Sequence, residues 1–370
     1  TQVDDFEGQN QNDEFTYYSQ LQISTPRQPT TRSSETSELE SLRLLVFDEE
    51  NRFLYSRSAV LGGFNSDNQS FDYSVRLISS TKKRFIHFIA NHDWDGFEQD
   101  YFLEGLDAGY LIGSLITKNS AYWSVSELES LNEGSLQGIN TKMMSNQAQI
   151  RVESSAQEFQ LEGFKIYNAY DRATVASFEV DERGQVNFSK DLNAIIPTVP
   201  SEAKLKTDED FQVTARKVFE RFTANEQPLF VLIKGTYNGV ENNYYKIDLK
   251  RDDSQIGVTK LYDILRNHSY NIRIRRVVGS GHDTEEKAVK APAGNNVFAS
   301  IELENYNAVS NGRHELVIGR LAQIIVRHPF TFETSVQYSE GLQNVQYLPS
   351  WDESDPYLEA LDESELSQGI

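Results

Sequence analysis

Hydrophobic and polar positions alternate in the first non-polar stretch of the chain, residues 15–23. Successive side chains of a β-strand point to opposite faces, so this period of two predicts a half-buried strand there. The preceding residues 1–14 are polar and are predicted to form a flexible leader. The positions on one face of the strand are Phe15, Tyr17, Ser19, Leu21 and Ile23.

The segment that follows, residues 24–38, is rich in hydroxyl side chains and contains two prolines. Proline removes backbone donors from a β-ladder, and little in this segment is suited to burial, so we expect an exposed loop. The loop contains Arg27 and Arg32. An arginine in an exposed loop is a good target for a trypsin-like protease, which makes these residues candidate cleavage sites.

Short strand patterns recur along the rest of the chain. Helical spacing occurs only in parts of residues 99–132, and residues 261–267 are predicted to form a helical turn. Many short strands with frequent turns predict an all-β fold with minor helices and β-sandwich architecture. The predicted strands cover residues 42–47, 71–77, 85–90, 149–152, 164–170, 229–233, 244–249, 270–278, 297–303 and 314–334.

The length and one linker indicate two domains. A chain of 370 residues exceeds the usual size of one domain, and residues 196–207 form a polar, proline-containing stretch. We therefore predict an N-terminal domain over residues 1–200 and a C-terminal domain over residues 201–370.

The chain is acidic, with 56 Asp and Glu against 35 Lys and Arg and a formal net charge of −21. This balance argues against binding to nucleic acid and against electrostatic docking on anionic lipids. Residues 1–26 hold five acids and no base, and the 43 residues after Arg327 hold nine acids and no Lys or Arg. The acidic ends fit solvated tails, and the alternative is that they are interaction segments.

No motif for catalysis or for cofactor binding is present. There are no cysteines, and no two of the six histidines are spaced i, i+4, so we expect no metal site and no cofactor. The Gly279-Ser-Gly281 sequence is followed by acids that would repel a phosphate, which indicates a turn. The carboxylate pair of a glycosidase stays open as an alternative, although no pattern marks one. We expect a protein that is not an enzyme.

The three tryptophans suggest one candidate ligand contact. Isolated aromatic residues in β-sandwiches more often belong to the core than to a sugar-binding platform. Trp94 differs from the others because it lies in a polar loop, residues 91–96. Trp94 is therefore the candidate contact for a ligand such as a glycan.

A succession of short motifs is shared with one known family. In the second half these are YYKIDL at 244–249, LRNHSYNIRI at 265–274, GSG at 279–281, EEKA at 285–288 and NN at 295–296. The first half adds residues 42–48, 88–91 and 164–170. In this order, over roughly residues 15–305, the motifs resemble the fimbrillin superfamily, the type V pilus subunits of Bacteroidetes. The resemblance implies two tandem transthyretin-like β-sandwich domains and a non-enzymatic structural or adhesive subunit of a bacterial surface fimbrium.

The resemblance also implies how such a subunit matures and assembles. It implies export as a lipoprotein precursor to the outer membrane, followed by cleavage of a loop by an arginine-directed protease. Residues 15–23 would be the displaceable strand, and Arg32 the cut site with Arg27 as runner-up. A strand donated by a neighbouring fimbrial subunit would then fill the groove. The chain itself lacks the lipid-bearing cysteine and starts at Thr1, so we expect that a leader has been removed.

The C-terminal region departs from the pattern of a stalk subunit, which ends in its donor strand. Here an acidic tail, residues 349–370, follows the candidate donor segment, so a tip or anchor role is expected instead. Other fimbrial subunits are the expected partners, together with a glycan or protein on a host or bacterial surface. The alternative is a surface glycan-binding lipoprotein that does not polymerise. The candidate donor residues are Phe330, Phe332, Val336, Tyr338, Val345 and Tyr347.

Overall fold

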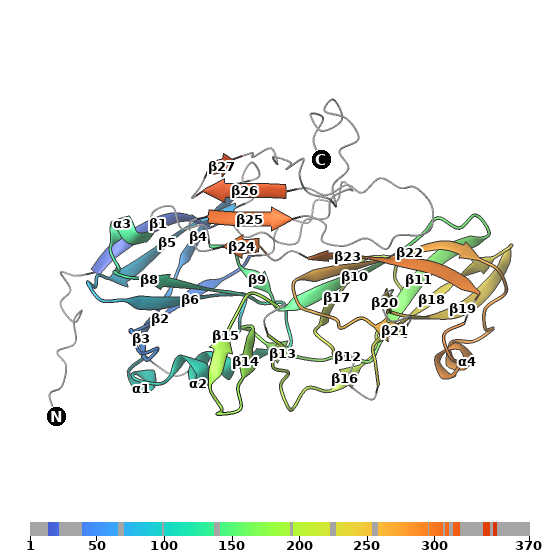
Figure 1. Ribbon diagram of the computed structural model, residues 1–370, viewed down its shortest axis with the longest axis horizontal. Coiled ribbons are helices and arrows are strands. Elements are labelled where there is room, and N and C mark those ends of the chain that lie inside the picture. The colour runs from blue at the N-terminus through green and yellow to red at the C-terminus, as the bar shows by residue number, and fades with distance from the viewer. Residues whose placement is uncertain are drawn as a thin grey trace, which may run out of the picture.

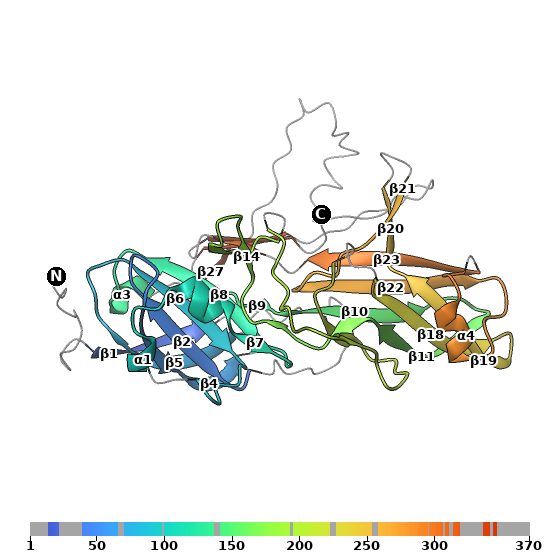
Figure 2. The same cartoon turned by 90° about the horizontal axis from the view of Figure 1, so that it is seen from below.

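The structure is a computed structural model in which β-strands predominate (Figures 1 and 2). The residues that it describes are 14–21, 39–65, 70–97, 100–136, 141–192, 195–222, 227–253, 258–294, 296–305, 308–310, 314–318, 336–340 and 343–345. None of the helices in these ranges has the length and apolar character needed to cross a membrane.

Within the described ranges the helices are short and the strands are numerous. The helices are α1 (Asp100–Leu103), α2 (Ala108–Gly113), α3 (Glu133–Leu136) and α4 (Glu285–Lys290). The strands up to residue 188 are β1 (Glu14–Leu21), β2 (Leu42–Phe47), β3 (Phe53–Ser58), β4 (Val60–Asn65), β5 (Ser70–Ile78), β6 (Arg84–Ala90), β7 (Ile116–Thr117), β8 (Tyr122–Leu128), β9 (Met144–Ser145), β10 (Gln147–Ser154), β11 (Phe159–Tyr167), β12 (Ala169–Tyr170), β13 (Ala173–Thr174), β14 (Phe178–Val180) and β15 (Val186–Phe188). The later strands are β16 (Leu205–Lys206), β17 (Arg216–Phe219), β18 (Phe230–Tyr237), β19 (Val240–Asp248), β20 (Lys250–Asp253), β21 (Val258–Leu261), β22 (His268–Val277), β23 (Val297–Asn305), β24 (Ala308–Ser310), β25 (His314–Ile318), β26 (Val336–Glu340) and β27 (Gln343–Val345).

A five-stranded sheet, in the order β3-β2-β6-β8-β9, is the centre of the N-terminal unit. A three-stranded sheet, β1-β5-β4, packs on one of its faces. Alternate residues of the facing strands fill the space between the two sheets, as the period of two requires. Leu44 of β2, Val75 of β5 and Phe88 of β6 are among these core residues, and all three are buried.

The opposite face of the five-stranded sheet carries a second core. Helices α1 and α2 and the β14–β15 hairpin cover this face. Because the central strands are covered on both faces, β2 and β6 are almost continuously apolar. His87 of β6 lies in this core, where its Nδ1 accepts a hydrogen bond of 3.1 Å from the indole Nε1 of Trp123.

The C-terminal unit is a second pair of packed sheets. One has the order β17-β10-β22-β23, in which β10 and β22 run parallel, and the other has the order β11-β18-β19. Their inner residues form one core that includes Ile150, Ile233 and Ile272. The two units lie at opposite ends of the long axis in both views (Figures 1 and 2).

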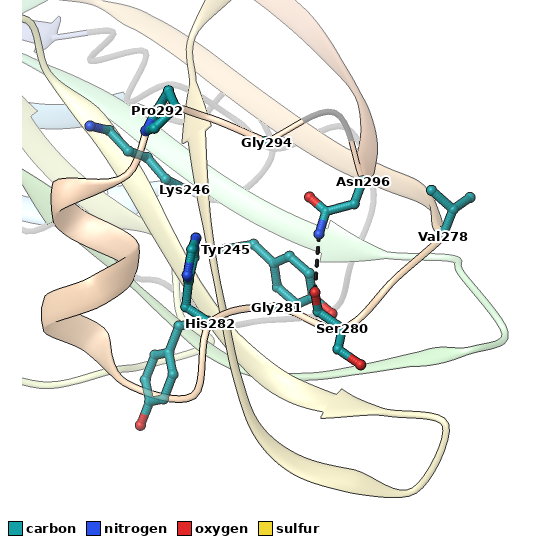
Figure 3. A pocket seen from close by; sticks show the side chains of 10 residues that line it. Tyr245, Lys246, Val278, Ser280, Gly281, His282, Pro292, Gly294 and Asn296 are labelled. Atoms are coloured by element: carbon teal, nitrogen blue, oxygen red, sulfur yellow. Dashed lines mark hydrogen bonds between the residues drawn. The ribbon is translucent and has the colours of Figure 1, made fainter.

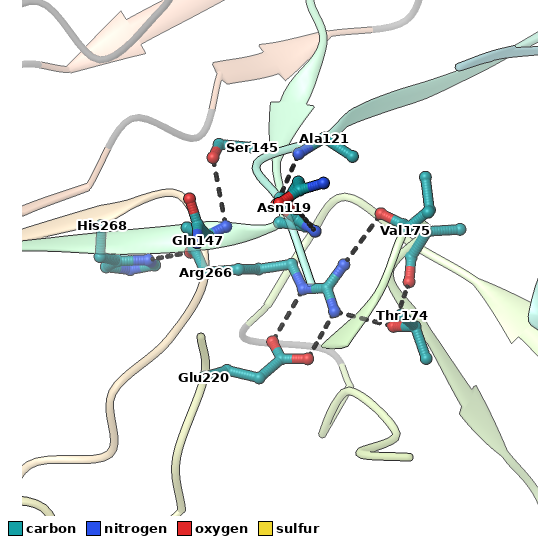
Figure 4. A network of polar contacts seen from close by, with 11 residues as sticks. Asn119, Ala121, Ser145, Gln147, Thr174, Val175, Glu220, Arg266 and His268 are labelled. Carbon is teal, nitrogen blue, oxygen red and sulfur yellow. Dashed lines mark hydrogen bonds and ion pairs between the residues drawn. The ribbon is translucent and has the colours of Figure 1, made fainter. Parts of the chain in front are cut away.

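A buried polar network joins the two units (Figure 4). Arg266, just before β22, donates to both carboxylate oxygens of Glu220, at 2.7 Å from Nε and 2.5 Å from Nη2. The same guanidinium reaches the Val175 carbonyl at 3.2 Å and the Thr174 hydroxyl at 2.9 Å. Thr174 belongs to β13, which pairs with β7 of the N-terminal unit. One buried cation therefore links residues that are about ninety positions apart in sequence.

Comparison with the sequence analysis confirms the strand-rich fold and corrects some elements. The predicted strand 42–47 coincides with β2, whereas the predicted helical turn at 261–267 is wrong. There the chain is held by the Tyr270 hydroxyl, which donates to the Asp263 carbonyl at 2.6 Å and accepts from Leu265 N at 2.9 Å. Helical spacing in residues 99–132 is only partly realised, because residues 122–128 form strand β8 in the five-stranded sheet.

The predicted boundary at residue 200 stays a prediction. Strands β10 and β11 precede it and contribute to the core of the C-terminal unit, while the β14–β15 hairpin that follows them contributes to the N-terminal unit. The chain thus crosses between the two cores before residue 200. Of the predicted strand 314–334, β25 covers residues 314–318 and the remainder lies outside the described residues.

Candidate functional site

The first strand, β1, is an edge strand that pairs with β5 and also lies against α3. Its eight residues pair antiparallel with β5, from Glu14 opposite Ile78 to Leu21 opposite Phe71. Among the described strands, β5 is the one that pairs with β1 in the sheet order β1-β5-β4 (Figure 1). An edge strand can be removed without breaking any other ladder, and its removal leaves the backbone groups of its neighbour unpaired.

The register determines which residues of β5 lie opposite the alternating residues of β1. The alternating positions Phe15, Tyr17, Ser19 and Leu21 are opposite Leu77, Val75, Tyr73 and Phe71 of β5, respectively. Those four β5 residues are the ones that belong to the core between the two sheets, with exposed fractions from 0% to 7%. Directly paired positions of an antiparallel ladder share a face of the sheet. The alternating pattern of the sequence is therefore in register with the core positions of β5.

The other elements expected for strand exchange are only partly described. Arg27, Arg32 and Ile23 lie outside the described residues, as do Phe330, Phe332 and Tyr347. Val336 and Tyr338 are in β26 and Val345 is in β27, opposite Tyr338. These strands belong to a separate four-stranded antiparallel sheet, β24-β25-β26-β27. Their roles as cleavage sites and donor residues stay predictions.

Trp94, the candidate ligand contact, lies in a packed aromatic group. The guanidinium carbon of Arg43 is 4.7 Å from the centre of a Trp94 ring and 5.0 Å from that of Phe97. His92 and Phe97 approach Trp94 edge-on, at centroid distances of 4.9 Å and 4.8 Å. Arg43 also donates from Nε to the Ser56 hydroxyl at 3.1 Å. Arg43 thus occupies ring surface that a sugar would need, and the role of Trp94 in ligand binding stays a prediction.

Burial lowers the pKa of two members of this group. The pKa of His92 is lowered by burial, against the opposing effect of Asp93, which favours the neutral imidazole at pH 7. Burial also lowers the pKa of Arg43, while Asp100 acts in the opposite direction. Across the part of the chain that the structure describes, no group of three His, Asp or Glu residues is arranged to hold a metal ion.

A surface pocket of about 530 Å³ (Figure 3) is lined in part by β19, which lies at the far end of the C-terminal unit (Figure 1). Its walls come from β19, from the loop between β22 and α4, and from the segment between α4 and β23. The Gly279-Ser-Gly281 sequence, interpreted as a turn, forms part of one wall. No pattern in the sequence marks the pocket, because its walls are separated by up to about fifty positions. The lining residues are Tyr244, Tyr245, Lys246, Val278, Ser280, Gly281, His282, Pro292, Gly294 and Asn296.

Backbone contacts hold the pocket loop in place. Tyr244 and His282 exchange both backbone hydrogen bonds at 2.9 Å, and Gly281 N donates to the Asn243 side chain at 2.9 Å. Gly281 must be glycine here, because a Cβ would be 2.7 Å from the Tyr244 carbonyl oxygen. The hydroxyl of Tyr245 donates to the Gly279 carbonyl at 2.9 Å, and burial raises the pKa of Tyr245 to about 12.

Comparisons with known proteins identify fimbrial relatives. No family model matches the chain. The major fimbrium tip subunit FimE of Porphyromonas gingivalis is 23% identical over 337 residues, which are 85% of this chain and 57% of the relative. The chain thus spans little more than half the length of this relative. FimE is a fimbrial subunit rather than an enzyme, in agreement with the expectation of a non-enzymatic protein.

Solved structures of similar proteins include fimbrial and adhesion proteins. The tip fimbrial protein Mfa3 from Porphyromonas gingivalis, with C-terminal truncation, aligns with a TM-score of 0.47 and 11% identity, over 78% of this chain and 99% of that structure. A putative cell adhesion protein from Parabacteroides distasonis aligns with a TM-score of 0.43 and 13% identity, over 78% and 96%. The sequence relationship to FimE confirms the resemblance that the motifs predict: the chain is homologous to a fimbrial tip subunit of Bacteroidetes.

Proposed function

We propose that this protein is a structural and adhesive subunit of a bacterial surface fimbrium, built from two tandem transthyretin-like β-sandwich domains. Its homology to a fimbrial tip subunit favours a position at the tip. Its partners are then other fimbrial subunits, and it reaches the cell surface as an exported lipoprotein precursor. The observation that carries the proposal is the register of β1, whose alternating residues are opposite the core residues of β5.

Assembly proceeds by strand exchange in this proposal. Loss of β1 removes the only partner on one side of β5 and leaves backbone donors and acceptors of β5 unpaired. It also uncovers one side of a core that includes Tyr73, Val75 and Leu77. A donor strand restores both the backbone ladder and the burial, which is the physical basis of β-augmentation. Such head-to-tail contacts build open chains of subunits rather than closed rings.

Proteolysis supplies the trigger. Cleavage after Arg32, or after Arg27, separates β1 from β2 covalently and leaves only non-covalent contacts to hold β1. Eight residues in an edge strand are too few to stay bound at low concentration once the covalent tether is lost, because dissociation gains the entropy of a separate peptide. Before cleavage, the covalent tether keeps β1 at a high effective concentration near β5, so β1 stays paired with β5.

The test uses trypsin on the purified chain and a synthetic peptide of residues 330–348 that carries a fluorophore. Cleavage at 27 or 32 is expected to release the N-terminal peptide and to allow the labelled peptide to bind, as measured by fluorescence anisotropy. The variant Arg27→Gln/Arg32→Gln is the control, because it keeps β1 tethered and is expected not to bind. If the cut protein retains residues 15–23 and stays monomeric, strand exchange is refuted and the non-polymerising alternative is favoured.

A further inference from the structure

The pocket at the end of the C-terminal unit extends into an exposed apolar surface. Val278 N donates to the Asn296 carbonyl at 2.9 Å, and Arg276 is paired with Phe298 one step along the same β22–β23 ladder. Directly paired and alternate positions share one face of a sheet, so Val278 and Phe298 are diagonal neighbours on the outer face. Val278 is 44% exposed and Phe298 is 53% exposed. An exposed aromatic ring therefore lies beside the polar pocket.

The polar lining of the pocket consists of one ammonium group together with hydroxyl, amide and imidazole groups. No residue in its described wall carries a carboxylate, and its one ammonium group, that of Lys246, donates to the Val289 carbonyl at 3.3 Å and lies 4.2 Å from the Phe230 ring centre. The remaining groups are the hydroxyl of Ser280, the imidazole of His282 and the amide of Asn296 (Figure 3). Hydroxyl, amide and imidazole groups beside an aromatic ring are suited to a ligand that is both polyhydroxylated and partly apolar.

The walls of the pocket are pre-organised. The Tyr244–His282 bridge fixes one wall, and the Asn296 side chain donates to the Ser280 carbonyl at 3.2 Å, which joins two lining segments. Helix α4 is anchored to the underlying sheet by Glu285, which is 3.0 Å from the Lys165 ammonium and also accepts from the Tyr167 hydroxyl. A rigid pocket loses little conformational entropy when a ligand binds, which favours binding of a small ligand.

The location of the pocket fits an adhesive role. Strand β1 and strand β19, which contributes to the pocket wall, lie toward opposite ends of the long axis in both ribbon views (Figures 1 and 2). A subunit that receives a donor strand at β5 therefore presents the pocket away from the neighbour that donates it. The net charge of −21 disfavours an acidic ligand through long-range repulsion.

We propose that this pocket, with Phe298 at its rim, binds a neutral oligosaccharide. The proposal rests on the adhesive part of the proposed function and names the ligand class and its site. The sugar hydroxyls bond to Ser280, His282 and Asn296, and the apolar face of a neighbouring sugar ring packs on Phe298.

The test measures binding of four probes to the uncut monomer by saturation-transfer NMR and by titration calorimetry. Lactose, maltotriose and N,N'-diacetylchitobiose are the neutral probes, and sialyllactose is the acidic one. We expect at least one neutral probe to bind with a Kd of about 1 mM or tighter, and sialyllactose to bind more weakly. Phe298→Ala and His282→Ala are each expected to weaken binding by about fivefold, the loss of one packing or hydrogen-bonding contact.

The matched control is Phe102→Ala, since Phe102 is an equally exposed phenylalanine, 59% exposed, in α1 of the N-terminal unit. Phe102→Ala is expected to leave the Kd unchanged. Phe298 and His282 are both on the surface, and circular dichroism confirms that each variant is folded. The proposal is overturned if no neutral probe binds at about 10 mM, if sialyllactose binds best, or if all three variants bind like the wild type. Because the uncut monomer is used, these outcomes are independent of strand exchange.

Discussion

The buried ion pair between Arg266 and Glu220 makes a sharp prediction about stability. The side chains are 0% and 1% exposed, respectively, so neither charge is solvated by water. Glu220→Gln keeps the size and shape of the side chain but removes its charge. The guanidinium of Arg266 then stays buried without a counter-ion, at the point where it also binds Thr174 and the Val175 carbonyl.

The magnitude follows from the cost of an uncompensated buried charge. Removing one partner of a buried pair costs about 3–5 kcal/mol, because the remaining charge has lost both water and its partner. A matched control is Glu286→Gln, since Glu286 pairs with Lys290 at 2.5 Å while both side chains are more than 70% exposed. An exposed i, i+4 pair of this kind contributes only about 0.3–0.5 kcal/mol.

The assay is urea unfolding followed by tryptophan fluorescence, which includes the buried Trp123 in the same core cluster as Val175. Glu220→Gln is expected to lower the free energy of unfolding by about 3 kcal/mol or more, and Glu286→Gln by less than about 0.5 kcal/mol. The double variant Glu220→Leu/Arg266→Met removes both charges and is expected to recover part of the loss. If Glu220→Gln stays within about 1 kcal/mol of the wild type, the reasoning is refuted, since the charge would then be solvated or compensated by other groups.

Two further predictions concern the cores. Burial lowers the pKa of His87 to about 3, whereas the unfolded chain takes up a proton near pH 6.5. This contribution to stability is therefore complete above pH 6.5 and falls by about 3 kcal/mol by pH 4, so the pH dependence of urea unfolding should flatten in His87→Phe. Gly235→Ala would place a Cβ 2.3 Å from the Gln160 carbonyl oxygen, and thermal unfolding should show a free energy of unfolding lower by about 1–3 kcal/mol. The control Gly63→Ala, whose Cβ would have nothing within 4 Å, should leave the free energy of unfolding unchanged.

Local patterns in the sequence were enough to predict the character of many elements. Alternation over residues 15–23 predicted a half-buried strand, and β1 covers residues 14–21 in register with the core positions of β5. The apolar run at 85–90 predicted a strand, and β6 covers residues 84–90. These predictions succeed because the period of side-chain direction is a property of the strand itself. Isolated aromatic residues of β-sandwiches were expected to belong to the core more often than to a ligand site, and Trp123 is fully buried.

The pairing of the strands could not be predicted from the sequence alone. Strands β10 and β11 precede residue 200 yet pair with β22 and β18 of the C-terminal unit. Strand pairing depends on how much apolar surface the packed sheets bury together, and not on distance along the chain. The helical turn expected at 261–267 failed for a related reason: the Tyr270 hydroxyl and the Arg221–Ile264 bridge supply the hydrogen bonds that a helix would have made internally.

The sequence by itself determined the strand-rich class, the acidic ends, the lack of thiol chemistry and the resemblance to fimbrial subunits, since each depends on residue types and their local order. Only the tertiary structure decided that Arg266 meets Glu220 and Thr174, and that Ser280, His282 and Asn296 surround one pocket. Such sites join residues that are distant in sequence, and their energies depend on desolvation and geometry that exist only after the sheets have packed.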